Sequence, residues 1–385
     1  MTVIALLVFW ISGALILYAY AGFPLIIALR GALFPMRHKM ADITPSVSLI
    51  VAAYNESAVI ADKMRNIADL DYPPDQFEAI VASDGSTDGT AAIALAAAGD
   101  GVQVLDLPRQ GKAAALNTAI GLAQGDILVM SDASTIYRPD AIRNLVRHFA
   151  DERVGGVAGN QRYVKRRQGG NNAGEAAYWD FDRQLKLWES QAGNTISATG
   201  SIYAIRRALF QGVPAGMTDD FAVSTSVIVQ GYRLIFDPDA VAFEAVAPNQ
   251  KREFTRKVRV MTRGLTGVLY RRELVNPFRY GFYAVQLFTH KLLRRLLFIP
   301  MILILVSNVL LISFSRFYAL TLAAQAVFYG AALIGWWLMQ RGVRLPKLLS
   351  VATYVCMVYA AAAVATWNVV RGRRIVRWTT QGTPG

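Results

Sequence analysis

The stretch Glu-Ala-Ile-Val-Ala-Ser-Asp-Gly-Ser-Thr-Asp-Gly-Thr, residues 78–90, joins a short apolar run to a turn rich in Asp, Gly, Ser and Thr. The apolar run predicts a buried β-strand over 78–83. Ser, Thr and Asp in the turn are good N-caps for the alanine-rich segment that follows, which predicts a helix over 90–98. The fold of the middle of the chain is inferred from this strand–turn–helix unit.

The same unit recurs on both sides of this stretch. Apolar runs predict further strands over 46–53, 102–107 and 126–131, and a second helix over 112–123. Strands that alternate with helices in this way imply a parallel sheet with helices on both faces. We therefore expect an α/β domain with a mostly parallel sheet.

Acidic side chains stand at the ends of three of the four predicted strands. Glu56 follows the first strand, Asp84 the second and Asp132 the fourth. Ligands of such sheets bind beyond the carboxyl ends of the strands, and three acids at one edge are costly unless positive charge lies among them. Lys112 begins a predicted helix nearby, and the set suggests a nucleotide-diphosphate site with a divalent metal. Taken singly, each acid is equally well explained as a helix cap, a turn residue or a solvated loop residue.

The composition indicates membrane segments beside this domain. Of 385 residues, 54% are hydrophobic and 17% are charged, whereas soluble domains have about 25% charged residues. Four uncharged runs, at 1–29, 296–315, 317–340 and 348–370, are each long enough to cross a bilayer core as a helix. The first run lacks the basic start and the shorter apolar stretch of a signal peptide. Cys356 is the only cysteine, which excludes an intrachain disulfide and makes a cysteine-based zinc site unlikely to form.

Five segments are expected along the chain. They are a transmembrane helix over 1–29, a cytoplasmic domain over 31–275, an amphipathic interface helix over 276–295, about three transmembrane helices over 296–370 and a basic tail over 371–385. Arg30, Arg37 and Lys39 follow the first span, which places the N-terminus outside and the large domain in the cytoplasm. The basic tail would then lie outside, against the same rule, unless one apolar run is re-entrant or interfacial.

The net charge of +13 is concentrated in one segment. Residues 251–295 contain twelve basic and two acidic side chains, a net +10. Because the segment directly precedes an apolar run, its expected partners are anionic membrane lipids or an anionic substrate, and nucleic acid is not an expected partner. The alternation of aromatic and basic residues over 277–295 favours a helix lying in the interface. The alternative is that these charges serve only as topology signals.

Four motifs in order carry a family resemblance. Val-Ala-Ala-Tyr-Asn-Glu (51–56), Ser-Asp-Gly-Ser-Thr-Asp-Gly-Thr (83–90), Arg109 with Gly-Lys-Ala-Ala-Ala-Leu-Asn (111–117) and Ser-Asp-Ala-Ser (131–134) resemble family 2 glycosyltransferases, in particular the membrane-integrated branch with cellulose, chitin and hyaluronan synthases. The resemblance covers roughly residues 45–270. It implies a GT-A fold, a UDP-sugar donor, a Mg²⁺ or Mn²⁺ ion and transfer with inversion. The donor-site residues that it implies are Ala53, Tyr54, Glu56, Asp84, Lys112 and Asp132.

Two later segments extend the resemblance. Residues 198–207, with Gly200 and Ser201, are similar to the strand that borders the acceptor site. Asp219 and Asp220 resemble the family's acidic pair, usually Glu-Asp, whose second member is the general base. Asp220 is thus the expected base and Asp219 a supporting residue. The pair is also explained as an N-cap of the helix that follows, and one residue can do both.

The sequence departs from the family's pattern at two places. Ser134 stands where the second acid of Asp-x-Asp often lies, so Asp132 and Ser134 are expected to hold the metal together with the diphosphate and water. Residues 256–260 stand where processive synthases have Gln-x-x-Arg-Trp, and they lack both the Gln and the acceptor-stacking Trp. That loss argues against long processive elongation. The basic residues of this segment, Arg256, Lys257 and Arg259, are nevertheless suited to binding a diphosphate.

The expected function is that of an inverting glycosyltransferase integral to the inner membrane, with its catalytic domain in the cytoplasm. It would move a sugar from a UDP-sugar to a lipid-linked or polysaccharide acceptor in surface polysaccharide synthesis, and other polysaccharide-assembly proteins are candidate partners. A processive homopolysaccharide synthase is the alternative within the class, although four candidate spans are few for a chain-conducting tunnel. A catalytically silent membrane scaffold is the more remote alternative, and the intact Asp84, Asp132 and Asp220 speak against it.

Overall fold

The computed structural model describes residues 2–164, 173–214, 217–245, 250–343 and 345–373. The chain forms two compact units. The helical unit comprises Met1–Arg30, Gln168–Leu185 and Asn249–Arg374, and the sheet unit comprises Gly31–Arg167 and Lys186–Pro248. Two helices pass from one unit into the other, α2 (Phe23–Leu33) and α7 (Ala173–Ala192). Most of the tail predicted over 371–385 lies outside the described residues.

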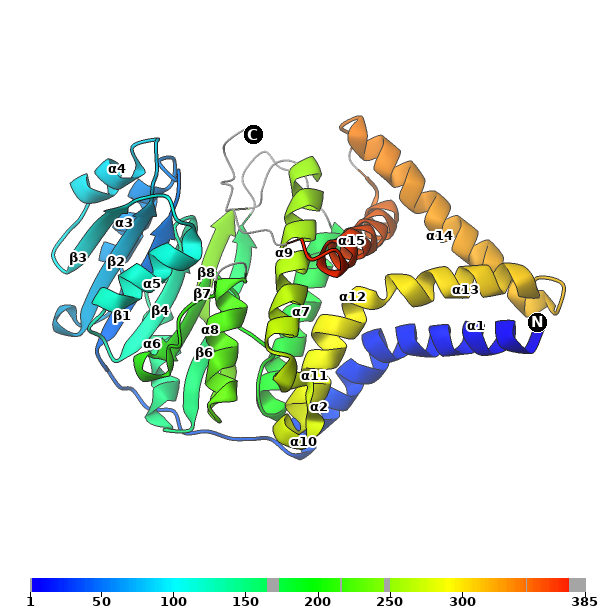
Figure 1. Ribbon diagram of the computed structural model, residues 1–385, viewed down its shortest axis with the longest axis horizontal. Helices are drawn as coiled ribbons and strands as arrows, with labels where there is room; N and C mark the ends of the chain where they lie inside the picture. Colours follow the sequence, from blue (N-terminus) through cyan, green and yellow to red (C-terminus); the bar gives the residue numbers. More distant parts are fainter. Residues whose placement is uncertain (1, 165–172, 215–216, 246–249, 344, 374–385) are drawn as a thin grey trace. The chain divides into compact units, whose positions relative to one another are not determined.

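The sheet unit is built on eight strands in the order β3-β2-β1-β4-β7-β6-β8-β5. The strands are β1 Val47–Ala53, β2 Phe77–Asp84, β3 Val102–Leu107, β4 Ile127–Asp132, β5 Thr135–Tyr137, β6 Val154–Val164, β7 Ile202–Arg206 and β8 Arg233–Ala245. The neighbours β3, β2, β1 and β4 run parallel and lie side by side in Figure 1. β7 is antiparallel to β4 and β6, β6 is parallel to β8, and β5 is antiparallel to β8. The α/β class and the four predicted parallel strands are confirmed.

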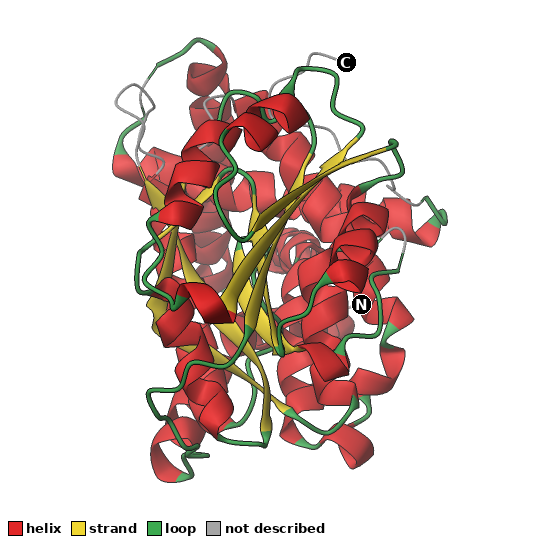
Figure 2. Ribbon diagram, turned by 90° about the vertical axis from the view of Figure 1, so that its left-hand side faces the viewer, coloured by secondary structure: helices red, strands yellow, loops and turns green. Residues whose placement is uncertain are grey.

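Both faces of the sheet are covered by helices, and this explains the apolar runs of the sequence. The helices of the sheet unit are α3 Ile60–Ala68, α4 Thr90–Ala96, α5 Lys112–Leu122, α6 Ala141–Val146 and α8 Asp219–Val229. Alternate residues of β1 point to opposite faces: Leu49 packs in one core with Ile60 of α3, and Ile50 packs in the other with Leu116 of α5. A strand buried on both faces needs apolar residues throughout, as β1 has. Figure 2 shows the twist of the strands, drawn in yellow.

The parallel strands bring their acids to one edge. The second and fourth strands each run one residue further than predicted, so Asp84 is the last residue of β2 and Asp132 the last residue of β4. Glu56 lies three residues beyond the end of β1. Because β1, β2 and β4 are parallel neighbours, all three carboxyl ends meet at the same edge of the sheet.

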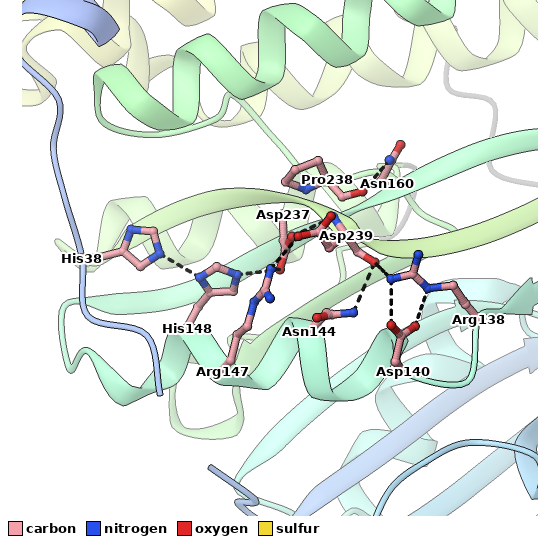
Figure 3. A network of polar contacts seen from close by, with 10 residues as sticks. All are labelled: His38, Arg138, Asp140, Asn144, Arg147, His148, Asn160, Asp237, Pro238 and Asp239. Carbon is pink, nitrogen blue, oxygen red and sulfur yellow. Dashed lines mark hydrogen bonds and ion pairs between the residues drawn. The ribbon is translucent and has the colours of Figure 1, made fainter. Parts of the chain in front are cut away.

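A polar network connects the linker between α2 and β1 to strand β8 (Figure 3). The Nε2 atom of His38 in the linker lies 2.7 Å from Nδ1 of His148, whose Nε2 lies 2.7 Å from Oδ2 of Asp237. Arg147 also donates to Asp237, over 2.8 Å. Burial, together with His148 and Arg233, lowers the pKa of His38 to about 4. The linker is thus held by a histidine that is neutral at physiological pH.

The helical unit contains the long apolar helices together with the basic helix α9 and several short helices. Its helices are α1 Thr2–Leu17, α9 Gln250–Tyr270, α10 Pro277–Tyr280, α11 Phe282–Leu287, α12 Arg294–Leu296, α13 Phe298–Leu311, α14 Arg316–Gln340 and α15 Lys347–Val370. The Phe9 ring of α1 meets the Tyr318 ring of α14 edge to face at 5.1 Å. Helix α15 packs along α9, where Lys257 donates to the Tyr354 hydroxyl over 2.9 Å.

Three helices of the described residues are long and apolar enough to cross a membrane: Thr2–Leu33, Arg316–Gln340 and Lys347–Val370. A fourth candidate is the pair Phe282–Leu296 and Phe298–Leu311, which is bent by 51° and is either a broken span or a re-entrant loop. The predicted run over 296–315 contains only the 14 residues of α13, about 21 Å of helix and short of the roughly 30 Å bilayer core.

The interface helix predicted over 276–295 is helical over most of its length but is interrupted near its start, and its position at a membrane interface stays a prediction. The segment consists of α10, α11, a π-helix over Phe288–Leu293 and the start of α12. Gly281 separates α10 from α11 with a φ of 54°, a backbone conformation that favours glycine. This glycine separates the four residues of α10 from a helix that runs without a break over Phe282–Leu296.

Candidate active site

Two loops at the sheet edge are joined by hydrogen bonds between their motif residues. Asn55, which follows β1, has a left-handed φ of 51°, a conformation that Asn tolerates better than most residues. Its Oδ1 accepts from the backbone N–H of Thr87, over 2.8 Å. The backbone N–H of Glu56 donates to Thr90 Oγ1, also over 2.8 Å. The loops after β1 and β2 therefore form one ordered rim beyond Ala53, the buried last residue of β1.

Asp84 is buried, and both oxygens of its carboxylate accept hydrogen bonds. It accepts from the backbone N–H groups of residues 110–111 over 2.8 and 2.9 Å and pairs with the Arg109 guanidinium. The same guanidinium lies 3.4 Å from the centroid of the Tyr54 ring. Gly85 has a φ of 63°, and a Cβ there would stand 2.7 Å from the backbone nitrogen of Arg109. Only glycine fits this approach, which brings Tyr54 and Asp84 together as predicted.

Lys112 bridges two carboxylates. Its Nζ lies 2.7 Å from Oδ1 of Asp132 and 3.1 Å from Oδ2 of Asp219. Burial lowers the pKa of Lys112, but the two carboxylates raise it, and the net direction is upward. The donor-site lysine and two of the predicted acids are therefore one cluster, arranged around a single positive charge.

The predicted acceptor strand and base adjoin this cluster. From where a Cβ on Gly200 would stand, the Cβ of Asp220 is 3.8 Å away and Oδ2 of Asp132 is 3.9 Å away. The hydroxyl of Ser201 is buried and has no hydrogen-bond partner among the described residues. Gly200 therefore lies between Asp132, a predicted donor-site acid, and Asp220, the predicted base.

Asp219 and Asp220 are the first two residues of α8. The N-cap is Thr218, and its side chain makes no capping hydrogen bond. Oδ1 of Asp220 accepts from the backbone N–H of Phe221, over 2.8 Å, so this acid does satisfy one donor of the first helical turn. The cap and base interpretations are compatible, because a carboxylate retains a second oxygen for another hydrogen bond.

The carboxyl group of Glu56 has a raised pKa. Burial, then Asp132, then Asp88 raise the pKa of Glu56 to about 7. The electrostatic influence of Asp132 places Glu56 in the same acidic neighbourhood, as its position beyond β1 predicted. A cation that entered this neighbourhood would favour the ionised form of Glu56.

The arrangement of the acids is better suited to a metal ion that a bound ligand also coordinates than to one coordinated by protein side chains alone. No group of three or more His, Cys, Asp or Glu side chains within the described ranges is arranged to hold an ion. Lys112 shows, however, that Asp132 and Asp219 can face one cation. Mg²⁺ is commonly bound by one or two carboxylates, with phosphate and water supplying the other ligands. Ser134, the other predicted ligand, lies in the turn between β4 and β5, two residues beyond Asp132.

The predicted diphosphate-binding residues Arg256, Lys257 and Arg259 lie on α9 of the helical unit. Lys257 is buried and donates to Tyr354, which gives it a role in helix packing. Burial and the neighbouring Arg263 and Arg256 lower the pKa of Arg259. Like charges gathered on one helix are suited to an anionic ligand, but the contact of these residues with a donor or acceptor stays a prediction.

Three site residues escaped the sequence analysis as candidates. Arg109 pairs with Asp84, and Asp88 accepts from the backbone N–H groups of residues 57 and 90 over 3.0 and 3.1 Å. Lys63 is fully buried on α3. Burial lowers the pKa of Lys63 to about 7, and Asp132 opposes that shift. The available signal was a lone lysine within the apolar face of a short helix.

Comparison with known sequences gives a consistent picture. Residues 48–213 match the family model described as Glycosyl transferase family 2. A Beta-monoglucosyldiacylglycerol synthase of Nostoc sp. is 33% identical over 163 residues, covering 41% of this chain and 34% of the relative. A Poly-beta-1,6-N-acetyl-D-glucosamine synthase of Staphylococcus aureus is 30% identical over 212 residues, covering 53% and 51%. The chain thus spans between a third and about half of the length of these curated relatives.

A solved structure resembles nearly the whole chain. It is a mannosyltransferase from Pyrobaculum calidifontis in complex with GDP-Man and Mn2+, with 26% sequence identity and a TM-score of 0.70. The similarity covers 95% of this chain and 99% of the other. It therefore includes the apolar helices as well as the sheet.

Proposed function

We propose that this chain is a family 2 glycosyltransferase, which the family-model match over residues 48–213 supports, and that it transfers one or a few sugars, with inversion, from a nucleotide-sugar to a lipid-linked acceptor. One observation carries the proposal. Lys112 joins Asp132 and Asp219 at the sheet edge, and Gly200 lies between Asp132 and Asp220. Such a site has a cation for a diphosphate, carboxylates for a metal and a base for an acceptor hydroxyl.

Each of these residues has a separate role in the proposed reaction. Tyr54 and Asp84 lie where the nucleoside would bind, and Lys112 is placed to move from the carboxylates to the donor's diphosphate. Asp220 accepts the proton of the acceptor hydroxyl as its oxygen bonds to the anomeric carbon. The bond from that carbon to the phosphate oxygen breaks on the opposite side, and the nucleoside diphosphate leaves with the electron pair. A Mg²⁺ or Mn²⁺ ion held at Asp132 and Ser134 would stabilise the negative charge of the diphosphate.

The donor is proposed to be a UDP-sugar, with GDP-mannose as the second candidate. The motifs around Tyr54, Asp84 and Asp132 support the first, through their resemblance to synthases that use UDP-sugars. The mannosyltransferase that matches 95% of the chain supports the second, because it was solved with GDP-Man and Mn2+. The two nucleotides differ in the size of the base, so direct competition between UDP and GDP separates them.

The acceptor is proposed to be a membrane lipid or a lipid-linked glycan. One relative is a glucosyldiacylglycerol synthase, and the chain has three to four candidate spans. Val260 stands where processive synthases have their acceptor-stacking Trp, and it is 47% exposed. A membrane-integrated enzyme with its sheet unit in the cytoplasm would meet a nucleotide-sugar and a lipid on the same side. A processive polymer synthase remains the second candidate, because another relative makes poly-β-1,6-N-acetylglucosamine.

The test is a donor screen on the purified full chain in detergent. UDP-glucose, UDP-N-acetylglucosamine and GDP-mannose would each be supplied with Mn²⁺ and an extract of membrane lipids, and release of the nucleoside diphosphate would be measured. Asp220→Asn is the matched control, since it keeps the volume of the side chain but removes the base. Release by the wild type and not by the variant supports the proposal. No release from any nucleotide-sugar would refute it in favour of a silent scaffold.

A further inference from the structure

Lys63 is a fully buried cation directly behind the acidic cluster. Its Nζ donates to Oγ of Ser131 and to the carbonyl oxygen of Thr135, both over 2.8 Å. The same atom lies 4.4 Å from the centroid of the Tyr137 ring. In the part of the chain that the structure describes, no carboxylate forms an ion pair with it. Two oxygens and an aromatic face therefore surround the three protons of an ammonium group.

Stability alone does not account for a lysine at this position. Burying a charge without an ionic partner is unfavourable, and an apolar side chain of similar volume often serves as well or better in a protein core. The neighbours of Lys63 on α3 include Met64 and Ile67, which pack into the adjacent core. A methionine in place of Lys63 would continue that packing. The two oxygens that the ammonium group binds therefore explain its presence better than packing does.

The two oxygens that Lys63 binds belong to residues on either side of Asp132. Ser131 precedes it, and Thr135 closes the short turn between β4 and β5. Oγ of Ser131 also donates to the carbonyl oxygen of Asp132, over 3.2 Å. One ammonium group thus fixes both ends of the segment that carries Asp132 and Ser134, and its charge acts on Asp132 from the protein interior.

We propose that Lys63 is a positioning residue that holds the β4–β5 turn so that Asp132 faces the donor's diphosphate and its cation. Its positive charge offsets part of the negative charge of the acidic cluster and stays in place when Lys112 turns toward the diphosphate. The inference deepens the proposed function and rests on it. Lys63 itself does not touch the substrate.

Asn66 provides a matched control on the same helix. Its Nδ2 donates to the carbonyl oxygen of Tyr137 and its Oδ1 accepts from the backbone N–H of Tyr137, both over 2.8 Å. It fixes α3 to β5 just beyond the turn, without charge and without contact to Ser131 or Thr135. A purely structural role for Lys63 predicts equal consequences for both residues, whereas a positioning role predicts that only Lys63 affects the donor site.

The experiment compares Lys63→Met with Asn66→Leu in the full-length protein in detergent. Binding of UDP and of GDP would be measured by calorimetry while Mn²⁺ is titrated, and unfolding temperature would be recorded in parallel. We expect Lys63→Met to weaken nucleotide binding in Mn²⁺ by about tenfold or more, the loss typical of residues that orient a metal ligand. We expect it also to raise the Mn²⁺ concentration needed for binding. Asn66→Leu should lower the unfolding temperature while affinity stays within about threefold.

Each outcome decides the question. Wild-type affinity in Lys63→Met, or equal losses of affinity in both variants, would overturn the inference and leave the proposed function standing. A wild-type protein that binds neither nucleotide would overturn the proposed function, and the inference with it. If Lys63→Met does not fold, Ser131→Ala decides instead: it removes one of the two oxygens that Lys63 binds and should weaken Mn²⁺-dependent binding, and wild-type affinity in that variant would refute the positioning role.

Discussion

The charge balance around Lys112 makes a prediction about stability that does not require knowledge of the substrate. Lys112→Met would leave Asp132 and Asp219 without the cation between them, whose Nζ lies 2.7 Å from the first carboxylate and 3.1 Å from the second. Two unit charges about 3 Å apart interact by roughly 5 kcal/mol at an effective dielectric constant of about 20. The Asp132 side chain is 32% exposed, so solvent screens part of this energy. We expect a loss of about 1–3 kcal/mol in the free energy of unfolding.

The effect of a divalent metal on stability should then be small in the wild type and large in Lys112→Met. In the wild type, Lys112 already neutralises the two carboxylates, so Mn²⁺ without nucleotide should change the unfolding temperature little. In Lys112→Met the carboxylates are free to take the ion, and Mn²⁺ should restore most of the lost stability. A loss of 1–3 kcal/mol corresponds to roughly 2–12 °C for a unit of this size. Thermal unfolding followed by tryptophan fluorescence, in Mn²⁺ and in EDTA, measures both quantities.

A control separates this effect from lost packing. Lys112→Arg keeps the charge and should stay close to wild-type stability in EDTA. The reasoning would be refuted if Lys112→Met were as stable as wild type in EDTA, or if Mn²⁺ stabilised both proteins equally. Nucleotide affinity should fall in the Lys112→Met variant even with Mn²⁺ present, because the diphosphate loses its cationic partner.

Three further predictions concern other residues of the account. Asp132→Ala should abolish nucleotide binding in Mn²⁺ and Ser134→Asp should preserve or tighten it, whereas UDP affinity unchanged by EDTA would contradict a metal at this turn. Asp220→Asn should bind nucleotide normally while transfer falls about 10²-fold or more; a wild-type transfer rate would make Asp219 the candidate base. The pKa of His38 is about 4 in the folded protein and 6.5 in the unfolded chain, so its contribution to stability is complete above pH 6.5 and is lost as pH falls toward 4. The full shift would make the wild type lose about 2 kcal/mol more than His38→Gln between pH 7 and pH 5, and solvent screening of the half-buried ring reduces the expected difference to about 1 kcal/mol. Equal losses in the two proteins would show that His38 does not cause this pH dependence.

The parallel half of the sheet could be predicted because its signals are local. The apolar run before Asp84 is buried on both faces, and the residues after it cap a helix, so strand, turn and helix are all encoded within one short stretch. The carboxyl ends of parallel neighbours must meet at one edge. That constraint alone predicts that Glu56, Asp84 and Asp132 lie together, as they do at the ends of β1, β2 and β4.

The antiparallel half could not be predicted in the same way. β5 has three residues, too few for a periodic pattern, and it pairs with β8, about a hundred residues away in the sequence. Of the site residues that were missed, Lys63 depends in the same way on contacts with distant parts of the sequence. A lone lysine on the apolar face of a short helix does not reveal its partner, and only the fold places it behind Ser131. The break at Gly281 was hidden by an amphipathic pattern that continues across it.

The most direct test of the central claim is the size and solubility of the product. Membranes containing the protein, and matched membranes containing Asp220→Asn, would be supplied with nucleotide-sugars labelled in the sugar, and the products would be extracted into organic solvent and resolved by mass. The account predicts labelled short glycolipids in the wild-type extract and none above background with the variant. Label found only in a high-molecular-weight, solvent-insoluble polymer made by the purified protein would contradict it and establish the processive synthase instead.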